Sequence, residues 1–385
     1  MTDKIQLCTH ENCTGCRACG DICPVKCIDF KEDKEGFYIP EINRAICVKC
    51  GKCMKTCPVI TPPHNNNTPN PKTYHAYSLN QQTVRSSSSG GIFVELAKQI
   101  ISQGGIVCGV TQISENLKAL NIAIESINDI HLLQGSKYVQ SDASGIYATA
   151  IKALKDGKKV LFSGTPCQIS GMKNAVRNIN SENLFLVEII CHGVPSYHFF
   201  QKYIAKAIPI EPKKYIFRNN AIWDFDSWYI DHHNKRQFLI GNSDFYMRSF
   251  LHGETFQEAC YVCPFAKLPR QADITLGDYW GIDKYQSPEN INKSGNSVIL
   301  INNGKGLSLL NQISDKCYIS EVELKNVVVR NHNIYEPSSY PHQRATIYTD
   351  MEQLPLNEMA KKYNHQFTLR NYLGFIKRRI KEFLL

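Results

Sequence analysis

The sequence predicts an α+β module in residues 1–61, followed by a larger α/β body whose sheet is partly parallel. Three observations support this fold class: a cysteine repeat at the start, a proline- and asparagine-rich break after it, and alternating strand and helix patterns beyond the break. A chain of 385 residues is also too long for one ordinary hydrophobic core, so we expect several domains.

The cysteine repeat consists of two runs, "CTGCRACGDICP" and "CVKCGKCMKTCP", which share the pattern C-x2-C-x2-C-x3-C-P. This is the pattern of two-cluster ferredoxins, in which three closely spaced thiolates hold one cluster and the fourth thiolate holds the other. Paired zinc knuckles fit less well, because zinc sites use four ligands in two pairs. We assign to the first 4Fe-4S cluster Cys13, Cys16, Cys19 and Cys57, and to the second Cys47, Cys50, Cys53 and Cys23.

Two further cysteines, Cys8 and Cys27, lie outside both runs and are expected to pack as small apolar side chains. The segment between the runs, "IDFKEDKEGFYIPEI", predicts a short hairpin. The segment "PVITPPHNNNTPNPKT" then loses apolar periodicity and predicts a linker at residues 62–72. The boundaries expected beyond the linker are 73–155 and 156–330 for two parts of the body and 331–385 for a C-terminal extension.

Composition narrows the function classes. Sixteen cysteines without a hydrophobic signal region predict a cytoplasmic protein that uses thiols for metal or cluster ligation. No stretch of about 18 apolar residues is present, so no membrane-spanning helix is expected. The net charge of +9 is compatible with nucleic acid, an anionic membrane or an acidic partner. No basic stripe with interleaved aromatic residues occurs, which argues against nucleic acid.

A polar, glycine-containing loop precedes the first long helix that the body predicts. The segment "RSSSSGGIFVELAKQIISQGG" places Ser88, Ser89, Gly90 and Gly91 directly before the apolar periodicity begins. Free N–H groups at a helix start favour a bound phosphate, and glycines allow its close approach. The alternative is that the serines only cap the helix. The sequence leaves both interpretations open.

Cysteines also follow two predicted strands of the body. The strand "KKVLFSG" leads into Cys167, the strand "NLFLVEII" leads into Cys191, and a helix follows each. If these strands are parallel neighbours, the two thiols share the sheet edge where α/β proteins bind ligands. Cys260 and Cys263 form a C-x2-C pair that lacks a second pair nearby. These four thiols could hold a third 4Fe-4S cluster, and zinc is the alternative.

Seven segments of the body, in this order, resemble the beta subunit of the coenzyme F420 (deazaflavin) hydrogenase and dehydrogenase family. They are "SSSSGGIFVELAKQIISQGG", "GSKYVQSD", "KKVLFSGTPCQISGM", "CHGVPS", "FRNN", "CYVCPFA" and "ADITLGDYWGI". The resemblance covers residues 74–330, and a ferredoxin module in front is common in the bacterial branch of this family.

The resemblance implies an iron–sulfur flavoprotein that binds FAD beside a 4Fe-4S cluster. It therefore favours a cluster over zinc for the third centre. It also implies FAD binding in residues 73–155 and a combined cluster, flavin and substrate site in residues 156–330. The cofactor contacts that it implies are Ser88, Ser89, Gly90, Gly91, Lys137, Tyr138, Gly164, Thr165, Gly277 and Asp278.

The segment "FRNNAIW" departs from the Arg-Asp-Lys that is more usual in the family. Arg218 is retained, but Asn219 and Asn220 stand at the acidic and lysine positions, which allows a different substrate. The catalytic residues stay unknown, since hydride transfer to a deazaflavin needs no proton donor. Weak candidates are His192, Tyr138 and Arg218, with a structural histidine and a surface salt bridge as the alternatives.

The leading function is an oxidoreductase that passes electrons between the clusters, FAD and a hydride carrier or organic substrate. Its donor would be ferredoxin or the reduced deazaflavin coenzyme, which could also be the substrate. Resemblance to proteins encoded with polysaccharide-assembly enzymes implies a reductive step in polysaccharide biosynthesis. The alternatives are an electron-transfer subunit that relays electrons to a partner enzyme, and a zinc-bearing interaction protein. The direction of electron flow and the oligomeric state stay open.

The C-terminal segment "LRNYLGFIKRRIKEFLL" predicts an amphipathic helix with a basic face. Its apolar face consists of Leu369, Tyr372, Leu373, Ile376, Ile380, Phe383 and Leu384. Such a helix could lie on the anionic inner face of the cell membrane. The alternatives are docking on the protein's own body, on a second copy or on a partner subunit.

Overall fold

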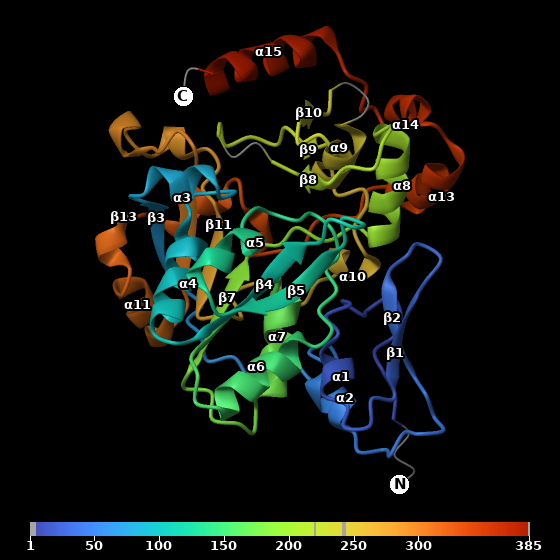
Figure 1. Ribbon diagram of the computed structural model, residues 1–385. Helices are drawn as coiled ribbons and strands as arrows, with labels where there is room; N and C mark the ends of the chain where they lie inside the picture. Colours follow the sequence, from blue (N-terminus) through green and yellow to red (C-terminus); the bar gives the residue numbers. More distant parts are fainter. Residues whose placement is uncertain (1–4, 219–220, 241–243, 384–385) are drawn as a thin grey trace.

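The computed structural model describes residues 5–218, 221–240 and 244–383 (Figure 1). Asn219 and Asn220, which mark the departure from the family pattern, lie outside the described residues. An N-terminal domain lies beside the lower half of a larger body, and the C-terminal helix crosses the top of that body (Figure 1). The expected α/β class, with an α+β module in front, is confirmed.

The N-terminal domain pairs two short helices with one hairpin. The predicted hairpin is β1 (Ile28–Glu32) paired antiparallel with β2 (Tyr38–Ile42). Inside each cysteine run a helix begins, α1 (Ala18–Asp21) and α2 (Lys52–Thr56). The residue before α2 is Gly51, with a φ of 71°, a left-handed conformation that glycine adopts at no steric cost.

The linker after the second run is tied to the body by its asparagines. Asn65 donates through Nδ2 to the carbonyls of Pro269 and Arg270, and Asn67 donates to those of Arg270 and Ala272. Asn174 of the body donates in turn to the Thr61 carbonyl at 2.7 Å. The segment therefore has a fixed course, although its composition predicts a flexible one.

The body is built on one eight-stranded sheet with the order β13-β3-β12-β11-β7-β6-β4-β5. Strands β4, β6, β7 and β11 are parallel, as expected, and both edges of the sheet are antiparallel. The strands are β3 (Lys72–Ser78), β4 (Ile106–Gln112), β5 (Ala119–Ile124), β6 (Val160–Gly164), β7 (Leu184–Ile189), β11 (Ile274–Asp278), β12 (Ser297–Ile301) and β13 (Cys317–Glu321).

Helices cover the sheet with their apolar faces. The face predicted for α4 (Ile92–Ser102) is buried at Ile92, Leu96 and Ile100. The remaining helices around the sheet are α3 (Gln81–Arg85), α5 (Ile130–Leu133), α6 (Ile146–Lys155), α7 (Pro166–Ala175), α10 (Glu258–Tyr261), α11 (Gly304–Asn311) and α12 (Leu324–Val328). Short 3-10 turns occur at Ile127–Asp129, Ile282–Lys284, Pro288–Asn290, Ser314–Lys316 and His332–Ile334.

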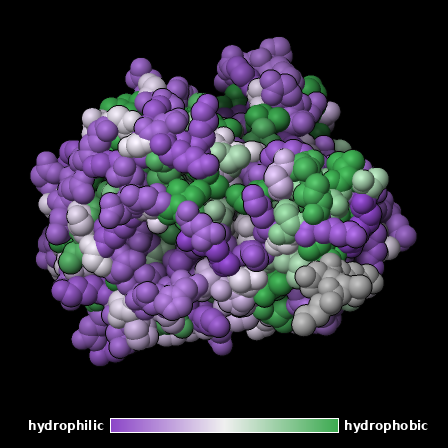
Figure 2. Space-filling view, turned by 90° about the horizontal axis from the view of Figure 1, so that it is seen from below, coloured by the Kyte–Doolittle hydropathy of each residue, from purple (hydrophilic) through white to green (hydrophobic). Residues whose placement is uncertain are grey.

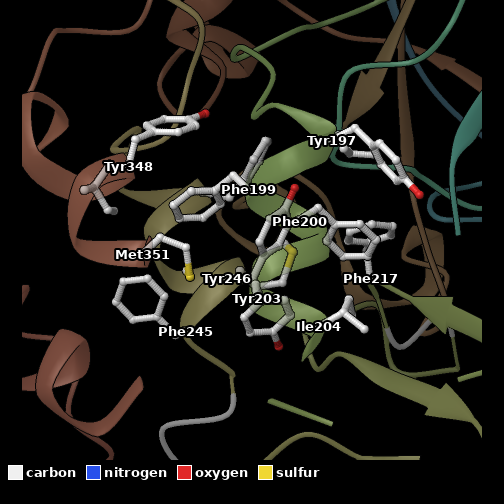
Figure 3. Packing of buried hydrophobic residues seen from close by; sticks show 14 of the residues in the cluster. Tyr197, Phe199, Phe200, Tyr203, Ile204, Phe217, Phe245, Tyr246, Tyr348 and Met351 are labelled. Atoms are coloured by element: carbon white, nitrogen blue, oxygen red, sulfur yellow. The ribbon is translucent and has the colours of Figure 1, made fainter. Parts of the chain in front are cut away.

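An aromatic core holds the upper part of the body together (Figure 3). Rings from α8 (Tyr197–Ala207) pack against rings from α9 (Phe245–Leu251) and α13 (Arg344–Gln353). Phe200 and Tyr246, for example, meet edge to face with centroids 5.0 Å apart. A small sheet of β8 (Lys214–Ile216), β9 (Trp228–Ile230) and β10 (Arg236–Phe238) and helix α14 (Leu356–Lys362) complete this region.

The C-terminal helix α15 (Leu369–Phe383) is attached to the body through its polar side. Arg378 forms a fork with Asp226, through Nε at 2.9 Å and Nη2 at 2.8 Å, and Arg379 reaches the same carboxylate. The ring of Phe375 meets that of Phe238. The predicted helix is confirmed, and its apolar face is turned away from these contacts.

No helix in the described part of the chain combines the length and the apolar character that a membrane crossing needs.

Candidate functional site

The cysteines assigned to the first cluster surround one hollow of the N-terminal domain. Cys13, Cys16, Cys19 and Cys57 line a space of about 380 Å³ together with Phe30 and Pro40. Burial raises the pKa of Cys13 to about 11 in the free-thiol form, so the thiolates need a compensating cation. Iron in a cubane supplies that charge, and the residues present therefore fit the cluster.

The cysteines assigned to the second cluster surround another hollow of about 310 Å³. Its lining includes Cys23, Cys47, Cys50 and Cys53, the set that the spacing predicts. Cys50 is exposed, whereas no thiol of the first set is fully exposed. The ligand assignments remain predictions, but the fold brings both predicted sets together.

The two cysteines outside the runs lie against the fourth thiol of each run. Cys27 Sγ is 3.4 Å from Cys23 Sγ, and the Cys27 amide donates to Cys23 Sγ. A hydrogen bond from Cys8 lowers the pKa of Cys57 to about 6. Cys8 and Cys27 were expected only to pack as small apolar side chains. Packing explains why Cys27 is buried, but it does not explain the contacts of Cys27 with Cys23 and of Cys8 with Cys57. Hydrogen bonds to ligand sulfurs adjust the reduction potentials of clusters.

The third set of cysteines converges from three segments. Cys167 lies in the first turn of α7 after β6, and Cys191 follows β7. Because β6 and β7 are parallel neighbours, these two thiols share one sheet edge, as expected. Burial and then the neighbouring Cys191, Cys263 and Cys167 raise the pKa of Cys260. Such mutual repulsion requires that the four thiols be close together.

A buried ion pair that the sequence analysis missed lies beside the third set. Arg270 Nε is 2.6 Å from Glu188 Oε1, and both side chains are fully buried. The Arg270 charge lowers the pKa values of Cys191 and Cys263, against the larger effect of burial. Arg270 Nη2 has no hydrogen-bond partner among the described residues. A free guanidinium donor beside thiolates fits an anionic cluster.

The three sets are adjacent in a fixed order. Cys19 packs against the buried cluster that contains Cys53, and burial and the neighbouring thiols, Cys53 among them, raise its pKa, which links the second set to the first. Cys167 packs against the buried cluster that contains Cys16, burial and then Cys167 raise the pKa of Cys16, and the Thr14 side chain hydrogen-bonds Cys167, which links the first set to the third. The order along this path is second, first, third.

Within the described residues, no group of three or more His, Cys, Asp or Glu side chains is arranged for a single metal ion. The zinc alternative for the third centre is not tested by this geometry.

Next to the third set lies an aromatic site around Arg218 and Asp278. Arg218 Nη1 is 2.7 Å from Asp278 Oδ2, and Trp223 Nε1 donates to Asp278 Oδ1 at 2.7 Å. The Trp223 ring stacks on Trp280 with centroids 4.9 Å apart. Arg218 Nε and Nη2 are buried without a hydrogen-bond partner among the described residues. The surface salt-bridge alternative for Arg218 is therefore wrong, since its side chain is only 2% exposed.

Two other predicted site residues face this aromatic site. Burial raises the pKa of Tyr138, and the neighbouring Arg218 charge opposes that shift. Burial and His332 lower the pKa of His192 to about 4, while Asp278 opposes the shift. Both side chains are thus uncharged near neutral pH. Since His192 directly follows Cys191, the aromatic site adjoins the third set of cysteines.

The predicted phosphate loop has less freedom than its sequence suggests. Gly90 donates its amide to Ser297 Oγ, Ser89 donates to the Asn296 carbonyl, and Ser88 Oγ accepts from the Ser136 amide at 2.7 Å. The N-cap of α4 is Gly91, with no side-chain cap, so the expectation that serine caps this helix is wrong. Phosphate binding by this loop stays a prediction, with the Gly90 amide already engaged.

The remaining residues that the resemblance implies as cofactor contacts lie close to other residues of the protein. Lys137 is half-buried, burial lowers its pKa to about 7, and its Nζ donates to the Gln134 carbonyl at the end of α5. Thr165 Oγ1 is 3.1 Å from Cys167 Sγ. A Cβ on Gly164 would lie 2.7 Å from Gln168 Oε1, and one on Gly277 would lie 2.4 Å from Ile190 Cδ1. Flavin contact by these residues remains a prediction.

Two separate parts of the chain match known protein families. Residues 157–327 match the family described as the C terminus of the beta subunit of coenzyme F420 hydrogenase/dehydrogenase, and residues 12–60 match the 4Fe-4S dicluster domain. The resemblance to this beta-subunit family is confirmed. The dicluster match supports iron–sulfur clusters in the N-terminal domain.

Individual relatives of the beta-subunit-like body and of the dicluster domain are distant. The F subunit of the F(420)H(2) dehydrogenase of Methanosarcina mazei is 23% identical over 208 residues, which are 51% of this chain and 58% of that protein. The ferredoxin-type protein NapF of Escherichia coli is 41% identical over 44 residues, 11% of this chain and 27% of that protein. The chain thus spans under two thirds of these relatives. An F420-reducing [NiFe] hydrogenase complex from Methanosarcina barkeri aligns with a TM-score of 0.47 and 15% identity, covering 76% of this chain and 92% of that chain.

Substitution of Cys263 by serine is expected to remove one cluster and spare two. Iron should fall by about four of about twelve atoms per chain, because each cubane needs its full set of thiolates. Cys317→Ser is the matched control, since Cys317 is buried in the sheet core away from all three sets. Iron assay and absorbance of anaerobically purified protein give the counts. Full iron retention in Cys263→Ser would show that this thiol is not a ligand.

Proposed function

We propose that the protein is an iron–sulfur flavoprotein oxidoreductase that moves electrons along three 4Fe-4S clusters to FAD and on to a hydride carrier or organic substrate. The observation that carries the proposal is the unbroken series of neighbouring side chains. Cys19 packs against the buried cluster that contains Cys53, Cys167 packs against the buried cluster that contains Cys16, and His192 directly follows Cys191 of the third set and lies near Asp278 of the aromatic site. A bound flavin supplies the exchange between single electrons and a hydride pair.

The residues of the aromatic site have distinct roles in this proposal. Arg218 offers Nε and Nη2 to an anionic group of cofactor or substrate, while Asp278 fixes its guanidinium. The stacked rings of Trp223 and Trp280 offer a flat apolar surface that excludes water. Tyr138, whose hydroxyl stays protonated, is the available proton donor, and the neutral His192 can accept a proton or donate a hydrogen bond.

A second candidate is an electron-transfer subunit that relays electrons to a partner enzyme. The name of the Methanosarcina mazei relative, a dehydrogenase subunit, favours it. Turnover of an organic substrate by the isolated chain with an artificial donor would distinguish the enzyme from the relay. For the enzyme, the substrate class that we propose on resemblance alone is a sugar- or lipid-linked intermediate of polysaccharide assembly, and the donor is ferredoxin or the reduced deazaflavin coenzyme.

Arg218 provides the direct test of the flavin site. Arg218→Gln should weaken FAD binding about 10- to 100-fold, because a hydrogen bond to a charged group contributes about 1.5–3 kcal/mol. Fluorescence titration of flavin-depleted protein measures the affinity, and iron content checks the fold. The exposed Arg330→Gln is the matched control. Arg218→Lys should be intermediate, since it keeps the charge without the fork. Unchanged affinity in Arg218→Gln would contradict the site.

We also propose peripheral contact between α15 and an anionic membrane. The apolar face of α15 is exposed to solvent, with Leu369 74% and Phe383 91% exposed, because the helix contacts the body through Arg378, which binds Asp226. Exposed Arg370, Lys377 and Lys381 lie on the same helix and form no ion pair with the described residues. Apolar burial with nearby cations is the arrangement of interfacial helices.

Leu373→Asp together with Ile380→Asp should abolish binding to vesicles that contain phosphatidylserine, because both exposed side chains would enter the bilayer surface. Ile127→Asp, at an exposed isoleucine outside α15, should bind like the parent protein. Co-sedimentation with anionic and with neutral vesicles measures the effect. Equal binding by all three proteins refutes the lipid contact, and a dimer that the double substitution dissociates identifies a second copy instead.

A further inference from the structure

We propose that the exposed rim of the second cysteine hollow is the docking surface for a small acidic electron-carrier protein. The rim is formed by Val25, Ile46, Val48 and Cys50, with the exposed cations Lys26, Arg44, Lys49, Lys52 and Lys55 on the same segments. This inference rests on the proposed electron path and adds the place where electrons enter it and the kind of partner that delivers them.

The second hollow is the one that a partner can reach. Val25, Val48 and Cys50 line it and are exposed, and Val48 keeps 59% of its surface accessible. Figure 2 shows hydrophobic side chains gathered on the lower face of the molecule where this domain lies, with hydrophilic side chains around them. An apolar patch bordered by polar groups is typical of a protein-binding surface.

The first set of thiols lies on the side of the N-terminal domain that contacts the body. Tyr147 Oη donates to the Cys16 carbonyl at 2.7 Å, and Gln257 Nε2 donates to the Cys13 carbonyl at 2.7 Å. Both of these cysteines are buried. Electrons that arrive from outside the N-terminal domain therefore meet the second set of thiols before the first.

The charge of the rim selects the partner. Residues 43–60 contain Arg44, Lys49, Lys52 and Lys55 and no Asp or Glu. Within the described chain these four cations form no ion pair with a neighbouring acid, so their field is directed outward. A basic rim attracts an acidic protein and speeds its association.

The rim offers a surface that suits a protein partner better than a small coenzyme. The hollow is lined by the four thiols that would hold the cluster, so the cluster itself takes that space. What remains outside is an exposed patch of valine, isoleucine and lysine side chains. Small ligands bind in concave pockets, whereas transient redox proteins use small exposed patches.

The test is the anaerobic reduction of the full-length, cluster-loaded protein by a reduced acidic two-cluster ferredoxin, followed by stopped-flow absorbance. Arg44→Glu with Lys49→Glu should slow the bimolecular rate about tenfold or more at low salt and weaken its salt dependence. The matched control reverses two exposed lysines of α6, Lys152→Glu with Lys155→Glu, and should keep the parent rate.

Reduction by dithionite should be the same in all three proteins, because a small anion needs no docking surface. If the double glutamate variant loses iron, Arg44→Gln with Lys49→Gln takes its place and should slow the reaction about threefold, since it removes attraction without adding repulsion. Equal rates for parent and rim variants, or equal slowing by the α6 control, overturn the proposal. If the clusters bleach but no flavin is reduced, the proposed function is contradicted. The comparison of rates between the rim variants and the α6 control would still test the docking surface.

Discussion

The fixed contact between the N-terminal domain and the body, made at the N-terminus of α6, at Asp142 and at α13, is the constraint on which the rest of the structure depends. Asp21 accepts the amides of Gly145 and Tyr147, at 2.7 and 3.0 Å, and so binds the N-terminus of α6 with its carboxylate. Arg17 is buried over the Tyr38 ring and pairs with Asp142 at 2.8 Å. Arg344 holds Glu35 through two hydrogen bonds. Because breaking a buried pair leaves an uncompensated charge, these contacts oppose any displacement of the domain.

That contact gives the cysteine sets their order. It brings Cys16 beside Cys167, although the two lie in different domains. Beyond the third set of cysteines, two buried ion pairs fix the side chains of the site. Arg270 and Glu188 form one buried pair behind the thiols, and Arg218 and Asp278 form another at the aromatic site. Each pair leaves guanidinium nitrogens unused among the described residues, which is the arrangement expected where an anionic cofactor completes the hydrogen bonds.

Local patterns made the elements and cysteine sets predictable. The two runs gave both ferredoxin sets, and the strand–cysteine–helix pattern gave the shared edge of Cys167 and Cys191, because parallel neighbours end at the same edge. The antiparallel pairing of β3, β12 and β13 depends on residues distant in the chain, so no local period revealed it. Arg270 was missed for the same reason: its partner Glu188 lies on β7, distant in the chain. The serine loop before α4 was misjudged because Ser297 and Asn296, which occupy it, come from β12 and the segment before it.

The most direct test of the central claim, an unbroken path through three adjacent clusters, is electron paramagnetic resonance of the fully reduced full-length protein. If the sets adjoin as Cys53 with Cys19 and Cys16 with Cys167 indicate, the spins of neighbouring clusters interact. The spectrum should then be broadened and split, and all its features should saturate together with microwave power. A spectrum that is the plain sum of three independent clusters would contradict the path.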